Sequence, residues 1–210
     1  MEDVFTKKFI ENSWKCDESR SGPSSTLTRT KNLREKLPIL IDKLNIKSIF
    51  DAPCGDLNWM KYFIDETKIT YIGGDIVLPM INSHKEHYSD IKNVNFIHID
   101  LTSQEYPVAD MMLCRDCLFH LSYDDTLKVL KNFVASRIPY LLTTTHFNKG
   151  QITNKDIVTG AWRWMDLFMP PYNFPKDTLS RITDGGGDRE MCLWSREQVA
   201  QVVETWPNVS

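Results

Sequence analysis

Short apolar runs alternate with helical patterns between residues 47 and 145, and this alternation limits the folds open to the chain. Each run is apolar at consecutive positions, which is typical of strands buried on both faces. Five such strands are predicted, at residues 47–51, 70–75, 94–99, 110–114 and 138–145. Because helices separate them, we expect an α/β fold, in which a parallel sheet carries helices on both faces.

Helical signals occupy the segments between and around these strands. Leucines recur at helical spacing over residues 33–44, although Pro38 is expected to kink or split that helix. Residues 57–66 predict a short helix, and Ser122, followed by two acids in the first turn, predicts the start of another. A capping box beginning at Ser195 predicts a final helix.

The composition changes after residue 145. Residues 146–177 are rich in Trp, Pro and Phe and have no clean period, so we interpret them as an insertion near the edge of the sheet. Residues 178–183 and 189–194 then predict a late strand pair, joined by a run of three glycines. The sheet is therefore expected to contain about seven strands within a single domain over residues 1–210, a length that suits one core.

Charge and cysteine content narrow the functional classes. The 25 Lys and Arg against 28 Asp and Glu give a net charge of −3, without the basic excess usual for nucleic-acid binding. No stretch approaches the roughly 18 apolar residues of a membrane span. Five scattered cysteines favour reduced thiols and a cytoplasmic protein. Neither the Cys114-x-x-Cys117 pair nor the His84-x-x-His87 pair has partners at ligand spacing, so no metal is expected.

The turn after the first strand is the most informative part of the sequence. Strand, tight turn and helix follow one another over residues 49–60, which is where doubly wound sheets bind ligands. Gly55 supplies a residue without Cβ at the turn. The dinucleotide spacing G-x-G-x-x-G is absent, and Asp56 would repel a diphosphate but attract an ammonium or sulfonium group. The turn thus favours S-adenosylmethionine (SAM) over a dinucleotide.

Acidic residues also end the next two predicted strands. Asp75 is placed to accept from both ribose hydroxyls, and Asp100 from an adenine amino group, while Leu101 covers the ring. Each acid taken alone also fits a simple turn cap. Together with Asp51, they form a row along one crevice.

The sequence resembles the class I SAM-dependent methyltransferase family through the motifs DAPCGD, GGD and HID. The resemblance implies a Rossmann-like three-layer sandwich whose seven-stranded sheet is mostly parallel with a late antiparallel strand. It departs from the family pattern at two glycines, where Pro53 and Leu57 stand. The motifs PCGD-x-NWM, CRDC and TTTH also resemble small sugar O-methyltransferases, including capsular heptose enzymes. The cofactor-binding residues that these resemblances and the turn imply are Asp51, Ala52, Cys54, Gly55, Asp56, Asp75, Ile76, Asp100, Leu101, Cys114 and Arg115.

Methyl transfer to oxygen needs a base, because the acceptor must lose a proton. The candidates after the fourth and fifth strands are Asp116, His120 and His146. The alternatives are packing for His120, a solvated strand end for His146, and a salt bridge to Arg115 for Asp116.

Two flanking regions could complete an acceptor pocket. Residues 1–30, with Trp14, have the composition of a lid segment. The insertion at residues 146–177, on the acceptor side, adds candidate substrate-binding residues, namely Trp162, Arg163, Asp166 and Tyr172. Aromatic faces with charges suit a sugar or a sugar nucleotide; the alternative is that the aromatic side chains only pack over the sheet.

We therefore expect a SAM-dependent methyltransferase that acts on a small polar acceptor, with a sugar hydroxyl as the favoured group. N-methylation of a small molecule or a protein is an alternative within the same class. A catalytically silent SAM-binding partner protein is an alternative from another class.

Overall fold

The computed structural model describes residues 1–66 and 68–207. Seven strands form one sheet in the order β3-β2-β1-β4-β5-β7-β6. β7 is antiparallel to β5 and β6, and the pairs among β1–β5 are parallel. The strands are β1 (Ser48–Asp51), β2 (Thr70–Asp75), β3 (Val94–His98), β4 (Met111–Cys114), β5 (Tyr140–His146), β6 (Ser180–Asp184) and β7 (Arg189–Ser195). The predicted mostly parallel, seven-stranded sheet with a late antiparallel strand is confirmed.

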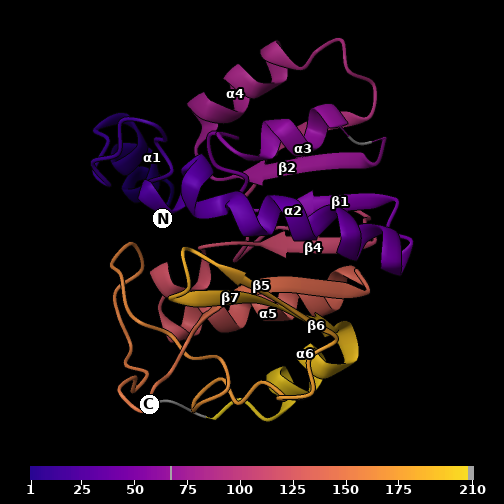
Figure 1. Cartoon of the computed structure of the whole chain (residues 1–210). Helices are drawn as coiled ribbons and strands as arrows, with labels where there is room; N and C mark the ends of the chain where they lie inside the picture. The colour runs from indigo at the N-terminus through magenta and orange to yellow at the C-terminus, as the bar shows by residue number, and fades with distance from the viewer. Residues whose placement is uncertain (67, 208–210) are drawn as a thin grey trace.

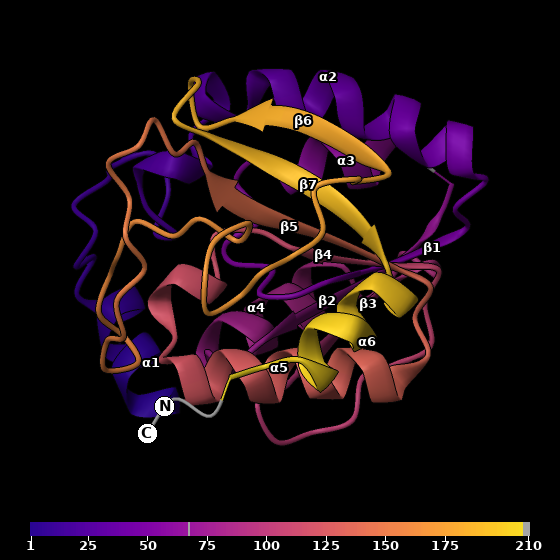
Figure 2. The same ribbon diagram turned by 90° about the horizontal axis from the view of Figure 1, so that it is seen from below.

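Helices cover both faces of the sheet. Figure 2 shows α2 on one side and α5 with α6 on the other, which gives the three layers expected. The α-helices are α1 (Glu2–Ile10), α2 (Leu27–Leu44), α3 (Met60–Glu66), α4 (Leu78–His87), α5 (Tyr123–Ser136) and α6 (Arg196–Glu204). Two short 3-10 turns, η1 (Pro23–Ser25) and η2 (Leu118–His120), lie near the carboxyl edge of the sheet.

Local chemistry sets where several elements begin and end. Ser122 accepts from the backbone N–H of Asp125 at the start of α5, and Ser195 forms the expected capping box of α6. β5 begins at Tyr140, two residues later than predicted, where the preceding Pro139 has no N–H to give to a ladder.

Pro38 was expected to kink or split this helix, and the split is wrong, because α2 runs from residue 27 to 44 without a break. Thr26 caps its start by accepting from the backbone N–H of Arg29, and Asn45 ends it in the left-handed conformation. Proline removes one hydrogen bond from the helix interior. Buried side chains on both sides of it, including Leu33 and Ile41, face one core and hold the two halves in line.

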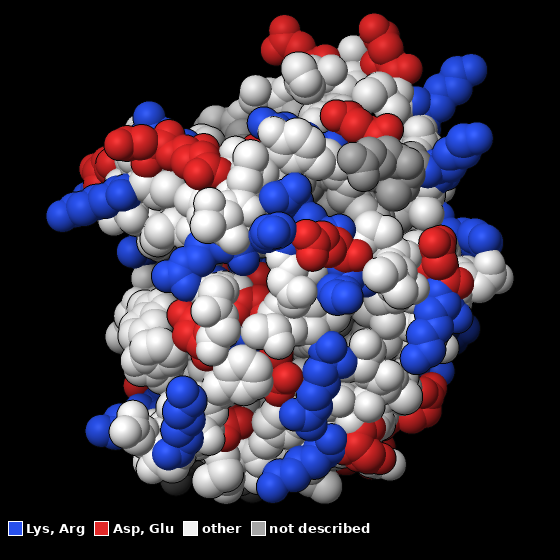
Figure 3. Space-filling model, viewed as in Figure 1, with Lys and Arg blue, Asp and Glu red and all other residues white. Residues whose placement is uncertain are grey.

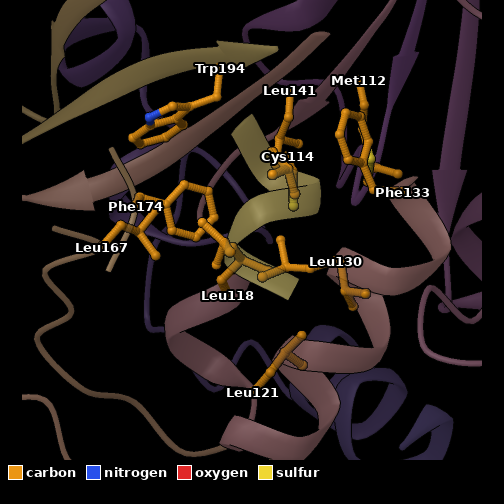
Figure 4. Packing of buried hydrophobic residues seen from close by; sticks show 14 of the residues in the cluster. Met112, Cys114, Leu118, Leu121, Leu130, Phe133, Leu141, Leu167, Phe174 and Trp194 are labelled. Atoms are coloured by element: carbon orange, nitrogen blue, oxygen red, sulfur yellow. The ribbon is translucent and has the colours of Figure 1, made fainter. Parts of the chain in front are cut away.

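Two apolar clusters fill the spaces between the sheet and its helices. The cluster under α5 and α6 includes side chains from the 146–177 insertion, among them Met165, Leu167 and Phe174. Figure 4 shows Leu167 and Phe174 together with Trp194 of β7 and Leu118 of η2. The insertion is thus part of the core, and its burial stabilises the loop in one position.

Charges of both signs are interspersed over the face drawn in Figure 3. Within the described parts of the chain, no helix is both long enough and apolar enough to cross a membrane.

The parallel strands end at one edge of the molecule. In Figure 1 the arrowheads of β1, β2 and β4 point to the side where α1 and the orange 146–177 segment lie. This edge brings together the residues that the sequence marks as functional.

Candidate functional site

A cavity of about 280 Å³ opens at the carboxyl ends of the parallel strands. We call it the strand-end cavity. Its wall is built from the turn after β1, the ends of β2 to β4, the N-terminal 25 residues, Trp162 of the insertion and Arg189 of β7. The expected site residues that line it are Trp14, Asp51, Cys54, Gly55, Asp56, Asp75, Ile76, Leu101, Arg115, Asp116, His120 and Trp162.

Hydrogen bonds hold the turn after β1 at Gly55. The Gly55 N–H donates to Asp75 Oδ2 at 3.0 Å, and the Gly55 carbonyl pairs with His84 Nε2 at 2.8 Å. Gly55 has a φ of +59°, and a Cβ there would collide with Ser21 Oγ. The position therefore requires glycine, and its backbone lies directly at the cavity.

Asp75 keeps acceptor capacity for a ligand. Oδ1 accepts from the Val77 N–H and Oδ2 from the Gly55 N–H, each at 3.0 Å. A carboxylate oxygen has two lone pairs, so each oxygen can accept a further hydrogen bond. Burial raises the pKa of Asp75, while the backbone donors oppose the rise. Donors from a bound ligand would favour the ionised form.

Asp51 is nearly fully buried at the end of β1. The Tyr71 hydroxyl donates to its Oδ2 at 2.6 Å. Burial raises the pKa of Asp51 to about 7, and the hydrogen bond from Tyr71 partly opposes the shift. A cation beside this carboxyl would favour its charged form.

Asp56 binds the N-terminal segment. Its carboxylate accepts from Ser19 Oγ at 3.0 Å, from the Arg20 N–H at 2.6 Å and from Ser21 Oγ at 3.1 Å. We call this set of contacts the lid latch. The sequence suggested that Asp56 attracts a ligand cation, whereas in the structure its oxygens hold the chain over the cavity.

At the third strand, Ile99, Leu101 and Thr102 line the cavity, and Asp100 does not. Asp100 Oδ1 accepts from the Thr102 N–H at 2.8 Å and from Thr102 Oγ1 at 2.7 Å. This is the turn-capping alternative. At the place where Asp100 was expected to meet an adenine ring, the cavity wall thus consists of two apolar side chains and a hydroxyl.

Ala52 and Cys114 also lie outside the cavity wall, although both were expected to contact the cofactor. Both are buried in the core cluster under α5 and α6. Figure 4 shows Cys114 beside Leu141, pointing into the packed interior. Alternate residues of a strand face opposite sides of the sheet, so these two positions support the wall from behind.

After β4, Arg115 and Asp116 belong to a buried ion-pair network. Arg115 Nε lies 2.9 Å from Asp184 Oδ2, and its Nη1 lies 3.3 Å from Asp116 Oδ2. Arg189 Nη2 also approaches Asp116 Oδ2, at 3.2 Å. Burial alone would raise the pKa of Asp116, but Arg115 and Arg189 outweigh it and hold that pKa below its usual range. A carboxylate paired in this way is a weak base. Asp116 therefore fits the alternative of a salt bridge to Arg115 and not the role of a base.

His120 faces the cavity in a defined tautomer. Its Nδ1 lies 2.7 Å from the Ala161 carbonyl, which can only accept, so Nδ1 carries the proton. Nε2 then has a free lone pair. Burial lowers the pKa of His120, against the opposing effect of the Ala161 hydrogen bond, so the ring is neutral at pH 7. Among the three candidates, His120 has the properties of a general base.

His146 lies behind the cavity wall. It is 2 % exposed, with its ring 5.0 Å from Phe119 and 4.8 Å from Trp164. The alternative of a solvated strand end does not describe it either. Its ring supports the aromatic side chains around the cavity.

Three expected substrate-binding residues also lie outside the wall. The Arg163 guanidinium donates to the Tyr172 hydroxyl at 2.5 Å and lies over the Tyr123 ring at 5.0 Å. Asp166 Oδ2 accepts from Asn148 Nδ2 at 3.0 Å. These polar groups fix the shape of the insertion, while Trp162 alone of the predicted insertion residues reaches the cavity.

Sequence reasoning missed much of the wall. The unexpected lining residues include Phe5, Phe9, Trp59, Ile99, Thr102, Phe119 and Arg189. Trp59 stood inside a motif already singled out, and Phe119 directly precedes the candidate base His120, so their large apolar side chains near strand ends were the available signal. Arg189 had none, because it reaches the cavity only through the fold-back of β7.

No family model matches the chain, and no curated protein matches it. The structure is similar to that of the Burkholderia thailandensis 1,6-didemethyltoxoflavin-N1-methyltransferase with bound S-adenosylhomocysteine, with a TM-score of 0.64 and 16 % identity, over 92 % of this chain and 87 % of that chain. The two proteins share the fold.

Two further solved structures agree. The methyltransferase domain of bacterial CtHen1-CN has a TM-score of 0.60 at 13 % identity, over 80 % of this chain and 99 % of that one. Human N-acetylserotonin methyltransferase in complex with SAM has a TM-score of 0.59 at 13 % identity, over 80 % of this chain and 52 % of that one. At such low identities the likeness concerns the fold.

Proposed function

We propose that the protein is a SAM-dependent methyltransferase that transfers a methyl group to a hydroxyl of a small acceptor. The observation that carries this proposal is that one cavity is lined by both Asp75, with oxygens free to accept, and His120, a neutral imidazole with a free Nε2. The methyltransferase fold of the neighbouring structures supports it.

The residues present fit the cofactor. Gly55 leaves backbone space that a Cβ would fill, and Asp75 would accept from the two ribose hydroxyls. Ile76 and Leu101 would flank the adenine ring. Asp51 would face the methionine ammonium, whose charge suits a carboxylate.

Bound SAM would supply a methyl group on a positively charged sulfur. His120 Nε2 would take the proton of the acceptor hydroxyl as that oxygen receives the methyl group, and the sulfur would leave as a neutral thioether. Positive charge disappears in this step, so carboxylates serve better at the ribose and ammonium than beside the methyl group.

A sugar hydroxyl or sugar nucleotide stays a prediction for the acceptor. Trp14 and Trp162 in the cavity wall support it, because flat rings can cover the C–H faces of sugars. Arg163, Asp166 and Tyr172, expected to hold its polar groups, lie elsewhere. The five cysteines are free, and a cytoplasmic location likewise stays a prediction.

His120→Ala tests the proposal. Release of S-adenosylhomocysteine (SAH) from SAM and acceptor should fall by about a hundredfold or more, the usual contribution of a general base. Calorimetry should give an unchanged affinity for SAH. His87→Ala, at an exposed position on α4, is the matched control and should behave as the wild type. Equal turnover in His120→Ala and wild type would reject the base, and SAH binding without turnover on any acceptor would indicate the silent binding protein.

A further inference from the structure

Four of the rings that line the strand-end cavity lie next to one another, and we call them the aromatic wall: Trp14, Phe119, His120 and Trp162. They come from the lid segment, the turn after β4 and the insertion. Ring centroids lie 6.3 Å apart for Trp14 and His120, 4.6 Å for Phe119 and His120, and 6.5 Å for Phe119 and Trp162. Three segments distant in sequence therefore place flat apolar surfaces around the proposed base.

Trp162 is unusual among these rings because half of its surface is exposed. Its inner neighbours hold it in place, with His146 at 6.2 Å and Trp164 at 5.0 Å, both nearly perpendicular to it. A large aromatic ring held firmly but left half exposed at a cavity gains burial when a flat ligand covers it.

Three charged side chains that line the cavity with the aromatic wall, Arg115, Asp116 and Arg189, are already paired with one another. Asp116 binds Arg115 and Arg189 at 3.3 and 3.2 Å. Arg163 and Asp166 serve the insertion itself. A sugar brings several hydroxyls into a pocket, and each one buried without a partner costs free energy. His120 Nε2, in contrast, offers one acceptor, which suits a molecule with one hydroxyl.

We infer that the acceptor is a flat aromatic ring with one hydroxyl, lying against Trp162 and Phe119 with that hydroxyl toward His120 Nε2. The inference rests on the proposed function and names a phenol-like molecule as its acceptor, where the sequence favoured a sugar. The half-exposed position of Trp162 leaves room for substituents of the acceptor to extend toward solvent.

A substrate panel tests the inference directly. Naphthol and umbelliferone carry one hydroxyl on a flat ring, whereas methyl glucoside and UDP-glucose carry sugar hydroxyls. SAH release from SAM is measured for each, with SAH binding measured separately by calorimetry. The aromatic probes should be methylated, with kcat/KM at least tenfold above either sugar. Faster transfer to a sugar, or no transfer to either aromatic probe by protein that binds SAH, would overturn the acceptor class and leave the cofactor assignment standing. Failure to bind SAH would reject both.

Substitutions at the aromatic wall give a second readout. Trp162→Ala should raise KM for naphthol by roughly fivefold to tenfold, the range expected for losing one aromatic contact. Trp162→Phe should restore most of this loss, and affinity for SAH should not change in either variant. The matched control is Met169→Ala, since Met169 is 43 % exposed in the same insertion but lies outside the cavity wall. Equal effects of Trp162→Ala and Met169→Ala would contradict direct stacking on the acceptor.

Discussion

Burial acts with opposite sign on two ionisable side chains of the strand-end cavity. It lowers the pKa of His120 and so keeps the imidazole neutral, as a base must be. It raises the pKa of Asp51 to about 7, so that this carboxyl is poised to lose its proton when a cation arrives. Each residue is suited to its proposed task by its surroundings, and each leads to a separate pH experiment.

The rate of methyl transfer should depend on pH through His120. Because burial holds the pKa of His120 below about 6.5, kcat should rise with pH on the acid side of that value and level off above it. His120→Gln should remove this dependence along with most of the activity. The rate is measured by SAH release between pH 5 and pH 9. A profile of the same shape in both proteins would assign the titration to another group.

Stability should depend on pH through Asp51. The folded carboxyl has a pKa of about 7, against about 3.9 in an unfolded chain. Between these values the folded state keeps a proton that the unfolded state has lost, so rising pH lowers the free energy of unfolding. The free energy of unfolding of Asp51→Asn, taken relative to that of the wild type, should therefore increase from pH 5 to pH 8 by a few kcal/mol. Urea denaturation of ligand-free protein measures this, and a difference independent of pH would contradict it.

The lid latch fastens one element onto the turn between β1 and α3. Besides the contacts to Asp56, the Arg115 guanidinium donates to the Ser24 carbonyl at 2.8 Å, and Asn58 Nδ2 donates to the Ser25 carbonyl at 3.0 Å. The sequence indicated a lid from its small polar residues. Asp56, which holds that lid in the structure, was expected instead to attract a cation of the ligand. The latch explains why an aspartate stands beside Gly55.

Asp56→Ala should loosen the lid. Hydrogen bonds to a charged acceptor contribute about 1.5–3 kcal/mol each, so loss of the latch should speed SAH release by about tenfold or more. Amide exchange over residues 18–26 should also accelerate. Asp17→Ala, an exposed position in the same segment, should change neither quantity. Unchanged release and exchange in Asp56→Ala would show that the lid is held by other contacts.

Besides the ladder between β5 and β7, a buried ion pair of Asp184 links the hairpin of β6 and β7 to Arg115 after β4. This carboxylate accepts from Arg115 at 2.9 and 3.2 Å in a fully buried site. Removing one partner of a buried pair leaves an uncompensated charge, so Asp184→Ala should lower the free energy of unfolding by about 3–5 kcal/mol. Asp124→Ala, which breaks an exposed pair with Lys128, should cost far less, because solvent screens that pair. Similar losses in both variants by urea denaturation would contradict a special role for the buried pair.

At the scale of the whole molecule, the fold was predictable because strands that are buried on both faces have apolar residues at consecutive positions. Residues of the cavity wall were predictable where the local sequence marked them, as with the turn glycine Gly55 and the strand-ending Asp75, and their contacts to a cofactor stay predictions. The cavity wall was not predictable where a residue type serves equally well in a binding site and in internal packing. Arg163 and Tyr172 are examples, because they contact each other inside the insertion. The lid was predicted as a segment, but its wall residues on α1 were not singled out, and Arg189 of β7 escaped prediction because only tertiary contacts bring it to the cavity.

A titration of SAH into the wild type and into Asp75→Ala tests the central claim most directly. The account predicts binding to the wild type and a loss of about tenfold or more in affinity for Asp75→Ala, because two hydrogen bonds to a charged acceptor disappear. Asp90→Ala, at an exposed position, should bind as the wild type does. Wild-type protein that fails to bind SAH, or that binds NADH in its place with Asp75 required, would contradict the account.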